Sequence, residues 1–530
     1  MVRGDCDSFC QESCVSSTVH ISCWIKSNGR HRQELPVFAT ALPRRRKFTR
    51  QRGVIAILCC AVLLGMLGLL GLALDLAQLY NRKAELQIMA DATALAAARE
   101  LNGASSGVNS AVTAAATAAG NFHYRYNLQT VSWSSDALRF AATPDTPDTA
   151  WTSAAGAQAS PASMMYAKVD TRLLGVDPGV VSTIFMRAAS NGRSTLSAAA
   201  RAVAGRVSTL VTPLAICAQS PAPAATRVNV SSNSSFNELV EFGFRRGVAY
   251  DLMNLNPNGL TPENFLIAPL ASPGMPGTAA DFATSVVGPF ICAGQLAMPT
   301  VMGGALTVQR GFPLSALYQQ LNSRFDDYSG NLCTPDAAPP DSNIRSYPYT
   351  TISWMATPAA QTAGAWTGGG KLWTRADPLP GDASNTAAQY GPLWAGARAV
   401  PYAAYAAQAT EPANGYAVFP VSAWASLYTP GPPTASGYPS AQSTATPYNQ
   451  TSGTHFLAPA AAHQPGVAKR RVLNVALLAC PVAPGAIASA TVLGVGRFFM
   501  TVPATATRLS TEFAGIAPPS SLSGALELQR

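Results

Sequence analysis

Residues 44–75 read RRRKFTRQRGVIAILCCAVLLGMLGLLGLALD, a basic run followed by 22 residues without a charge (53–74) and then Asp75. As an α-helix rising about 1.5 Å per residue, the uncharged run would span roughly 33 Å, about the thickness of the hydrocarbon core of a bilayer. A buried helix of this length in a soluble domain usually carries some polar side chain, whereas this run has none stronger than Cys59 and Cys60. Residues 53–74 therefore predict a transmembrane helix.

The flanks of this run predict its processing and orientation. A cleaved signal peptide has a similar layout, but its apolar run is shorter, and residues 75–78 (DLAQ) contain no small-x-small cleavage site. Six Lys/Arg lie within the nine residues before the run, whereas Asp75 begins the other side, so the positive-inside rule keeps the N-terminus in the cytoplasm. We expect an uncleaved single-pass anchor in the bacterial inner membrane, with the C-terminal bulk in the periplasm.

The charges of the chain are few and unevenly placed. Only 12% of the 530 residues are charged, and small residues and Pro dominate the second half, which predicts a loop-rich chain. Residues 1–52 carry ten Lys/Arg against four Asp/Glu, so they hold +6 of the formal net charge of +9. A nucleic-acid-binding domain needs a dense basic face, and none follows residue 52, so we expect no nucleic-acid partner.

One face of the apolar run carries mostly small residues at helical spacing: Ala61, Gly65, Gly68 and Leu72. Small residues at this spacing allow two helix backbones to approach closely, which suggests a homo-oligomer or a partner helix. Glycine is also frequent in membrane helices that have no such partner. The sequence leaves both interpretations open.

The helical pattern continues beyond the apolar run. Apolar residues recur at three-, four- and seven-residue steps at Leu72, Leu76, Leu79, Leu86, Ala90, Ala97 and Leu101. No Gly or Pro intervenes between Asp75 and Asn102-Gly103, a pair typical of a helix end. We expect one continuous helix of roughly 70 Å.

Several residues of this helix form a recognisable pattern: an Arg-x-x-Gly before the apolar run, an Asp followed by an aromatic residue, and LQIMADATALAAA at 86–98. With these features, residues 50–101 resemble the N-terminal segment of the TadE/TadG-like Flp pilus-assembly proteins of the tight-adherence system. The positions that carry the resemblance are Gly53, Asp75, Tyr80, Leu86, Gln87, Ala90, Asp91 and Leu95. Further stretches are similar to TadG-like proteins: LNSRFDDY (321–328), RRVLNVALLAC (470–480) and RFFM (497–500).

The resemblance implies a membrane-anchored structural or assembly component of the Flp pilus or of associated secretion machinery. Its partners would be other pilus-assembly or secretion proteins, and the length of the chain favours TadG over the shorter TadE. Prepilin-type members are cleaved after a Gly that Glu follows five residues on, whereas Leu58 stands five residues after Gly53, so we expect no pilin-like processing. A surface adhesin or minor pilus subunit is the alternative, because the second half is rich in Ala, Thr and Ser.

The expected fold class is a single-pass membrane protein with an α+β or mainly-β, loop-rich periplasmic region. Strands are expected within residues 131–140, 164–173, 182–190 and 194–207, and two closing strands within 473–482 and 491–502. The predicted segments are a basic N-terminus (1–52), whose first 40 residues an upstream start codon would explain; the transmembrane helix (53–74); a helical segment (75–120); a small β-rich module (121–207); and a large domain (208–530) with a flexible insertion at 428–465.

The cysteines fall into two groups. Cys217, Cys292, Cys333 and Cys480 lie in the predicted periplasmic part and are disulfide candidates with three possible pairings, free buried thiols being the alternative. A second set lies before the apolar run: Cys6, Cys10, Cys14 and Cys23. Their spacing lacks the paired C-x2-C of zinc sites, so we expect no metal site.

Signs of catalysis are weak. Residues 103–107 match the G-x-S-x-G nucleophile motif around Ser105, but they follow a predicted helix instead of a strand, so a linker is the better interpretation. The five histidines are scattered and form no metal-binding or triad pattern. We expect neither an enzyme nor a cofactor, and a periplasmic hydrolase using Ser105 is the least favoured alternative.

Overall fold

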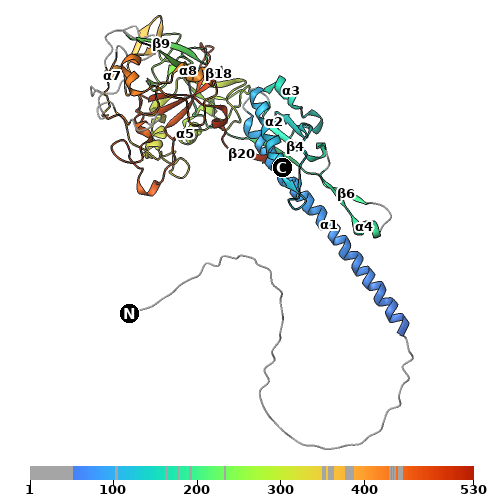
Figure 1. The fold of residues 1–530 in the computed structure, drawn as a ribbon. Coiled ribbons are helices and arrows are strands. Elements are labelled where there is room, and N and C mark those ends of the chain that lie inside the picture. Colours follow the sequence, from blue (N-terminus) through green and yellow to red (C-terminus); the bar gives the residue numbers. More distant parts are fainter. Residues whose placement is uncertain are drawn as a thin grey trace, which may run out of the picture. The chain divides into compact units, whose positions relative to one another are not determined.

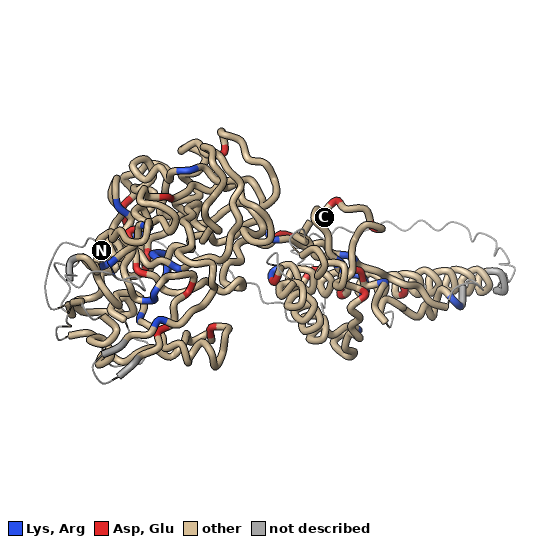
Figure 2. The backbone as a smooth tube through the Cα atoms, turned by 90° about the horizontal axis from the view of Figure 1, so that it is seen from above, with Lys and Arg blue, Asp and Glu red and all other residues tan. Residues whose placement is uncertain are grey.

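The computed structural model describes residues 52–529 except for short internal gaps, which are 102–104, 162–163, 176–177, 190–193, 232–233, 349–353, 356–362, 376–386, 429–430, 433, 435–436 and 440–445. The described chain divides into two units between residues 65 and 66. Figure 1 shows the order of the elements, and Figure 2 shows how few positions carry charge. The cytoplasmic segment and its cysteines, predicted from the sequence, lie outside the described residues.

The first helix, α1, runs from Arg52 to Glu100 without a break, so its 49 residues measure about 73 Å. The continuous helix predicted from the apolar spacing is therefore confirmed. Its expected end at Asn102-Gly103 lies outside the described residues. A second helix, α2 (Ser105–Gly120), follows, and it includes the last three residues of the linker expected at 103–107.

The second half of α1 packs on a four-stranded antiparallel sheet in the order β20-β7-β4-β3. The strands are β3 (Leu138–Ala141), β4 (Tyr166–Asp170), β7 (Arg201–Arg206) and β20 (Leu526–Gln529). β20 comes from the C-terminal end of the chain, which the predicted segments assign to the 208–530 domain, and it pairs with β7. Smaller elements complete this part: β1 (His123–Tyr124), β2 (Gln129–Thr130) and α3 (Ala154–Ala159).

The strand expected at 182–190 is wrong for most of its length. The segment forms β5 (Val180–Ser182) and then a helix, α4 (Ile184–Ala189), before β6 (Thr195–Ser197), which pairs antiparallel with β5. We call β5, α4 and β6 the α4 arm; it extends beside α1 (Figure 1). The β-branched and aromatic residues at the start of the segment favour a strand, whereas Met186 to Ala189 favour a helix, and α4 also contacts α1, as described below.

The large domain is built on a seven-stranded sheet in the order β12-β19-β18-β14-β13-β8-β17. Its strands are β8 (Leu214–Cys217), β12 (Ala249–Asp251), β13 (Asn264–Ile267), β14 (Ala305–Arg310), β17 (Val472–Leu478), β18 (Ile487–Met500) and β19 (Ser510–Ile516). β18 also pairs with β17, so five strands close into a barrel-like sheet. The two closing strands predicted from the sequence are β17 and β18, although β19 and β20 follow them.

Side chains along the barrel strands point alternately into two separate hydrophobic cores. In β8, for example, Ala215 and Cys217 belong to one core, and Leu214 and Ile216 belong to the other. The larger core is covered by α5 (Thr284–Ala293), α6 (Leu314–Asn322) and long loops. The remaining elements are β9 (Ala225–Ser231), β10 (Ser234–Glu241), β11 (Phe244–Arg245), β15 (Ala365–Gly368), β16 (Lys371–Thr374), α7 (Ala387–Tyr390), α8 (Tyr402–Ala407) and α9 (Trp424–Leu427).

The described part of residues 428–465 differs from the flexible insertion that its composition predicts. Tyr428 and Tyr438 are buried in the larger core, and Tyr448 packs against it. The Tyr438 hydroxyl donates to the Trp394 carbonyl at 3.1 Å. Within the described residues of this segment, aromatic side chains thus pack on the core, a contribution that counting turn-forming residues overlooks.

Candidate functional site along α1

The first part of α1 is apolar and uncovered. Leu64 and Leu69 are 68% and 70% exposed, and most of their apolar neighbours up to Leu74 are exposed as well. The core helix of a soluble domain would bury such side chains, and exposed apolar surface of this extent marks a contact with a membrane or a partner. Among the described residues, α1 is the one helix long and apolar enough to cross a membrane.

The predicted packing face of this stretch meets no other part of the described chain. A Cβ atom added at Gly65 or Gly68 would find nothing within 4 Å, and Ala61 and Leu72 are exposed. Gly53 belongs to α1, but its surroundings lie outside the described residues. A homo-oligomer or partner helix on this face stays a prediction.

One contact between α1 and the rest of the described chain lies at Gly71, which the sequence analysis did not single out. A Cβ at Gly71 would lie 2.6 Å from Cβ and Cγ of Phe185, so the ring of this α4 residue rests directly on the α1 backbone. One turn later, Asp75 is 1% exposed, and its Oδ2 accepts hydrogen bonds from the backbone N–H groups of Phe185 (3.0 Å) and Met186 (2.8 Å). Asp75 therefore supplies acceptors for N–H groups that the first turn of α4 leaves unpaired.

The 86–98 motif packs α1 against the core of the four-stranded sheet. Leu86 and Ala90 are fully buried against the sheet core. Gln87 donates to Asp91 Oδ1 at 2.7 Å and to the Arg201 carbonyl at 3.1 Å, which ties the helix to the first residue of β7. Two other positions of the family pattern differ from each other in their burial. Leu95 packs partly buried against the same core, whereas Tyr80 is 71% exposed and is not brought to the others.

The C-terminal end of α1 is held by a residue that sequence reasoning missed. The Arg206 side chain donates from Nη2 to the Arg99 carbonyl and, at 2.7 Å, to Ser523 Oγ. Its Nη1 donates to the Pro299 carbonyl at 3.4 Å. Burial lowers the pKa of Arg206 to about 10. One guanidinium thus joins α1 to two segments of the large domain, and only its position at the end of β7 reveals this role.

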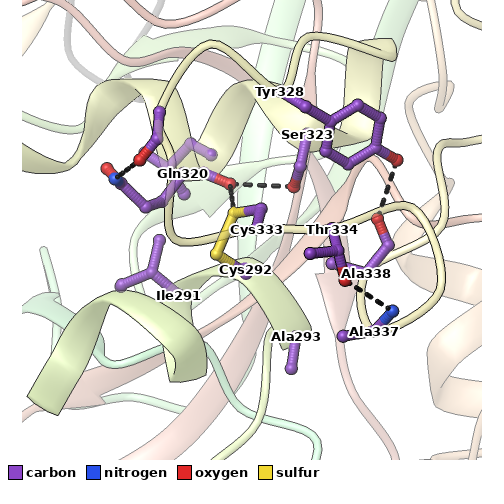
Figure 3. The surroundings of a disulfide bond; sticks show 12 residues. Ile291, Cys292, Ala293, Gln320, Ser323, Tyr328, Cys333, Thr334, Ala337 and Ala338 are labelled. Carbon is purple, nitrogen blue, oxygen red and sulfur yellow. Dashed lines mark hydrogen bonds between the residues drawn. A yellow bond between two sulfur atoms is a disulfide. The ribbon is translucent and has the colours of Figure 1, made fainter. Parts of the chain in front are cut away.

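The four candidate cysteines form two disulfides, Cys217–Cys480 and Cys292–Cys333. The first joins β8 to the residue two positions after β17, its parallel neighbour. The second joins α5 to the loop after α6, and the Tyr328 hydroxyl donates to the Ala338 carbonyl beside it at 2.9 Å (Figure 3). The sequence could not choose this pairing because the order of strands and helices in space decides it.

The three later stretches for which a similarity to TadG-like proteins is predicted meet around one buried arginine. Arg471 donates to the carbonyls of Asn343, Arg345, Met500 and Thr501 at 2.7–3.2 Å. Its guanidinium carbon lies 4.3 Å from the Phe325 ring centre and 4.6 Å from that of Phe499. Burial lowers the pKa of Arg471 to about 10. The stretches at 321–328, 470–480 and 497–500 therefore form one packed unit in the interior.

The chemistry around Ser105 fits a structural role. Its hydroxyl, at the start of α2, donates to the Gln158 carbonyl at 3.1 Å, which links α2 to α3. Two histidines make separate contacts: His123 Nδ1 lies 3.3 Å from the Asn121 carbonyl, and His463 Nδ1 lies 2.5 Å from Asp326 Oδ1. The described contacts of Ser105 do not include a histidine.

This geometry defines a class of protein: a chain whose apolar N-terminal helix fits a membrane anchor and whose mainly-β remainder packs on the far part of that helix. Residues 53–100 match the family model described as "Putative Flp pilus-assembly TadE/G-like", so α1 carries a TadE/G-like Flp pilus-assembly domain. The resemblance predicted from Gly53, Asp75, Tyr80 and the 86–98 motif is confirmed for this segment. No curated protein and no solved structure matches the chain, so the similarity of the three later stretches stays a prediction.

Proposed function

We propose that the protein is a membrane-anchored assembly component of the tight-adherence (Flp) pilus or its associated secretion machinery, and that it acts through protein–protein contacts in the periplasm. The observation that carries the proposal is the family match at 53–100, on a helix whose first part is apolar and exposed. In this proposal residues 53–74 cross the inner membrane once with the N-terminus inside. The rest of α1 then sets how far the outer domain stands from the bilayer.

The disulfides support the outer position of residues 208–530. Disulfides persist in the periplasm and are rare in the cytosol, and two of them join distant segments of the large domain. An alkaline-phosphatase fusion after residue 529 tests this topology: the fusion is expected to be active, because the phosphatase folds only in the periplasm. An inactive fusion that is stably produced would exclude the proposed orientation.

The assembly role itself is tested by deleting the gene and examining surface pili. We expect the deletion strain to make pilin but to lack pili, and the wild-type protein to remain in the membrane fraction after pili are sheared off. Recovery of the protein in the sheared pili would instead support the alternative of a minor subunit or adhesin, which the small-residue composition favours. Normal piliation of the deletion strain would refute both.

The proposal that the protein is not an enzyme has its own control. Ser105 donates to the Gln158 carbonyl, so Ser105→Ala removes one exposed hydrogen bond and leaves α2 in place. We expect this variant to restore piliation to the deletion strain as fully as the wild type. Loss of piliation with unchanged protein abundance would favour the hydrolase alternative.

A further inference from the structure

The α4 arm contacts α1 at the edge of its apolar run. Gly71, on which the Phe185 ring rests, is three residues before the last residue of that run, a rise of about 4.5 Å along the helix. If residues 53–74 span the hydrocarbon core, as the proposed function requires, this contact lies at the boundary between acyl chains and headgroups. The arm is therefore fixed at that depth by a backbone contact and by the two hydrogen bonds to Asp75.

The arm exposes apolar side chains at this level. Ile184 is 69% exposed and Phe185 is 44% exposed, although they occupy consecutive positions at the start of α4. On α1, Leu67 and Leu74 lie on the same face as Gly71, four residues before it and three after it, and both are 54% exposed. The apolar surface thus runs without interruption from the anchor on to the arm.

The polar groups at this contact suit a lipid boundary. A buried carboxylate is costly unless it is hydrogen-bonded, and Asp75, 1% exposed, obtains its two N–H donors from α4. An exposed cationic residue, Arg187, lies on α4 two residues after Phe185. Cationic side chains next to inserted apolar ones are typical of segments that lie in the interface of an anionic bilayer.

From this continuity we propose that the α4 arm is a second membrane contact, which lies in the bilayer interface beside α1 and inserts Ile184 and Phe185 at the acyl boundary. The proposal rests on the anchoring of the chain by residues 53–74. A second contact to one side of α1 restricts rotation of the helix about its own axis. The outer domain would then present a fixed side to its partners in the membrane.

Photo-crosslinking of the full-length protein in vesicles of phosphatidylethanolamine and phosphatidylglycerol tests this arrangement. Benzoylphenylalanine replaces one residue at a time: Ile184 in the arm, Leu67 in the anchor as the positive control, and Leu260 in the large domain as the negative control. Leu260 is 61% exposed, so it matches Ile184 in exposure and apolar character. We expect lipid adducts at positions 184 and 67 and none at 260, as detected by mass spectrometry.

The controls distinguish a failure of the arm proposal from a failure of the membrane anchor. Lipid adducts at 67 without any at 184 would overturn the arm proposal and leave the anchor intact. Absence of lipid adducts at both positions would overturn the anchor as well. Protein adducts at 184 in place of lipid adducts would show that the exposed face of the arm is a protein docking surface, which also refutes the proposal.

Discussion

Replacing Gly71 by alanine tests the contact between the α4 arm and α1 most directly. The added Cβ would lie 2.6 Å from both Cβ and Cγ of Phe185 and 2.7 Å from Cδ1, so the arm has to move away from the helix. Cβ of Phe185 is attached to the backbone, and the overlap therefore cannot be relieved by a rotation at the end of the side chain. Overpacking of this kind costs about 1–3 kcal/mol.

We expect this energetic cost to appear as faster hydrogen exchange of backbone amides in the α4 arm. Moving the arm loosens the hydrogen bonds from the Phe185 and Met186 N–H groups to Asp75. A loss of about 1–3 kcal/mol in the closed state corresponds to roughly 5- to 150-fold faster hydrogen exchange of these two amides. Hydrogen exchange followed by mass spectrometry on the full-length protein in vesicles measures this change.

Gly68→Ala provides the matched control. It adds the same methyl group to the same helix one turn earlier, where a Cβ finds nothing within 4 Å. Any general effect of exchanging Gly for Ala in a helix is therefore common to both variants. The control is expected to leave exchange of the arm amides unchanged. Equal exchange in the two variants would refute the packing of Phe185 on Gly71.

Three further predictions concern buried polar groups. Asp75→Ala should speed hydrogen exchange of the Phe185 and Met186 amides by about 2- to 30-fold, because losing a helix cap costs about 0.5–2 kcal/mol. Asp75→Asn retains an acceptor oxygen, so it should change the exchange of these amides little. Arg471→Met should lower the free energy of unfolding in urea by at least about 3 kcal/mol, because four buried carbonyls lose their donor, and Arg471→Lys should lose less. Burial raises the pKa of Glu512 from its usual 4.5 to about 7. The stability it contributes is therefore fully present below pH 4.5 and falls by about 3 kcal/mol as the pH rises to 7, and Glu512→Gln should remove this decline from the measured pH dependence of unfolding.

The sequence predicts α1 well because its signals are local. The uncharged run, the helical spacing from Leu72 to Leu101 and the 86–98 motif are all properties of neighbouring residues, and the structure extends them as one helix. The motif also predicts its own contacts: Leu86 and Ala90, which the pattern places on one face, are both buried. Most of the candidate site on α1 could therefore be found without a structure, whereas Gly71 could not, because its role depends on Phe185 in α4.

The α4 arm could not be found in this way because its cause is distant in sequence. Residues 182–190 carry Ile and Phe near their start in a pattern that favours a strand, and the helix-forming residues that follow, Met186 to Ala189, are too few to form a helix by propensity alone. The acceptor for its first N–H groups is Asp75, more than 100 residues earlier. The same limit applies to the Cys217–Cys480 disulfide, whose partners are 263 residues apart and meet because β8 and β17 are parallel neighbours.

The residues packed around Arg471 lie in the interior, so partners must bind elsewhere on the protein. Phe325 of the 321–328 stretch and Phe499 of the 497–500 stretch each place an aromatic ring against the guanidinium, and the Met500 carbonyl accepts a hydrogen bond from it. These side chains are buried, so they contribute to packing and are not available on the surface for a partner. Partner binding in an assembly component requires exposed groups. On α1, such groups lie on the apolar face that includes Gly65 and Gly68, and this face is where variants that change assembly without unfolding the protein are expected.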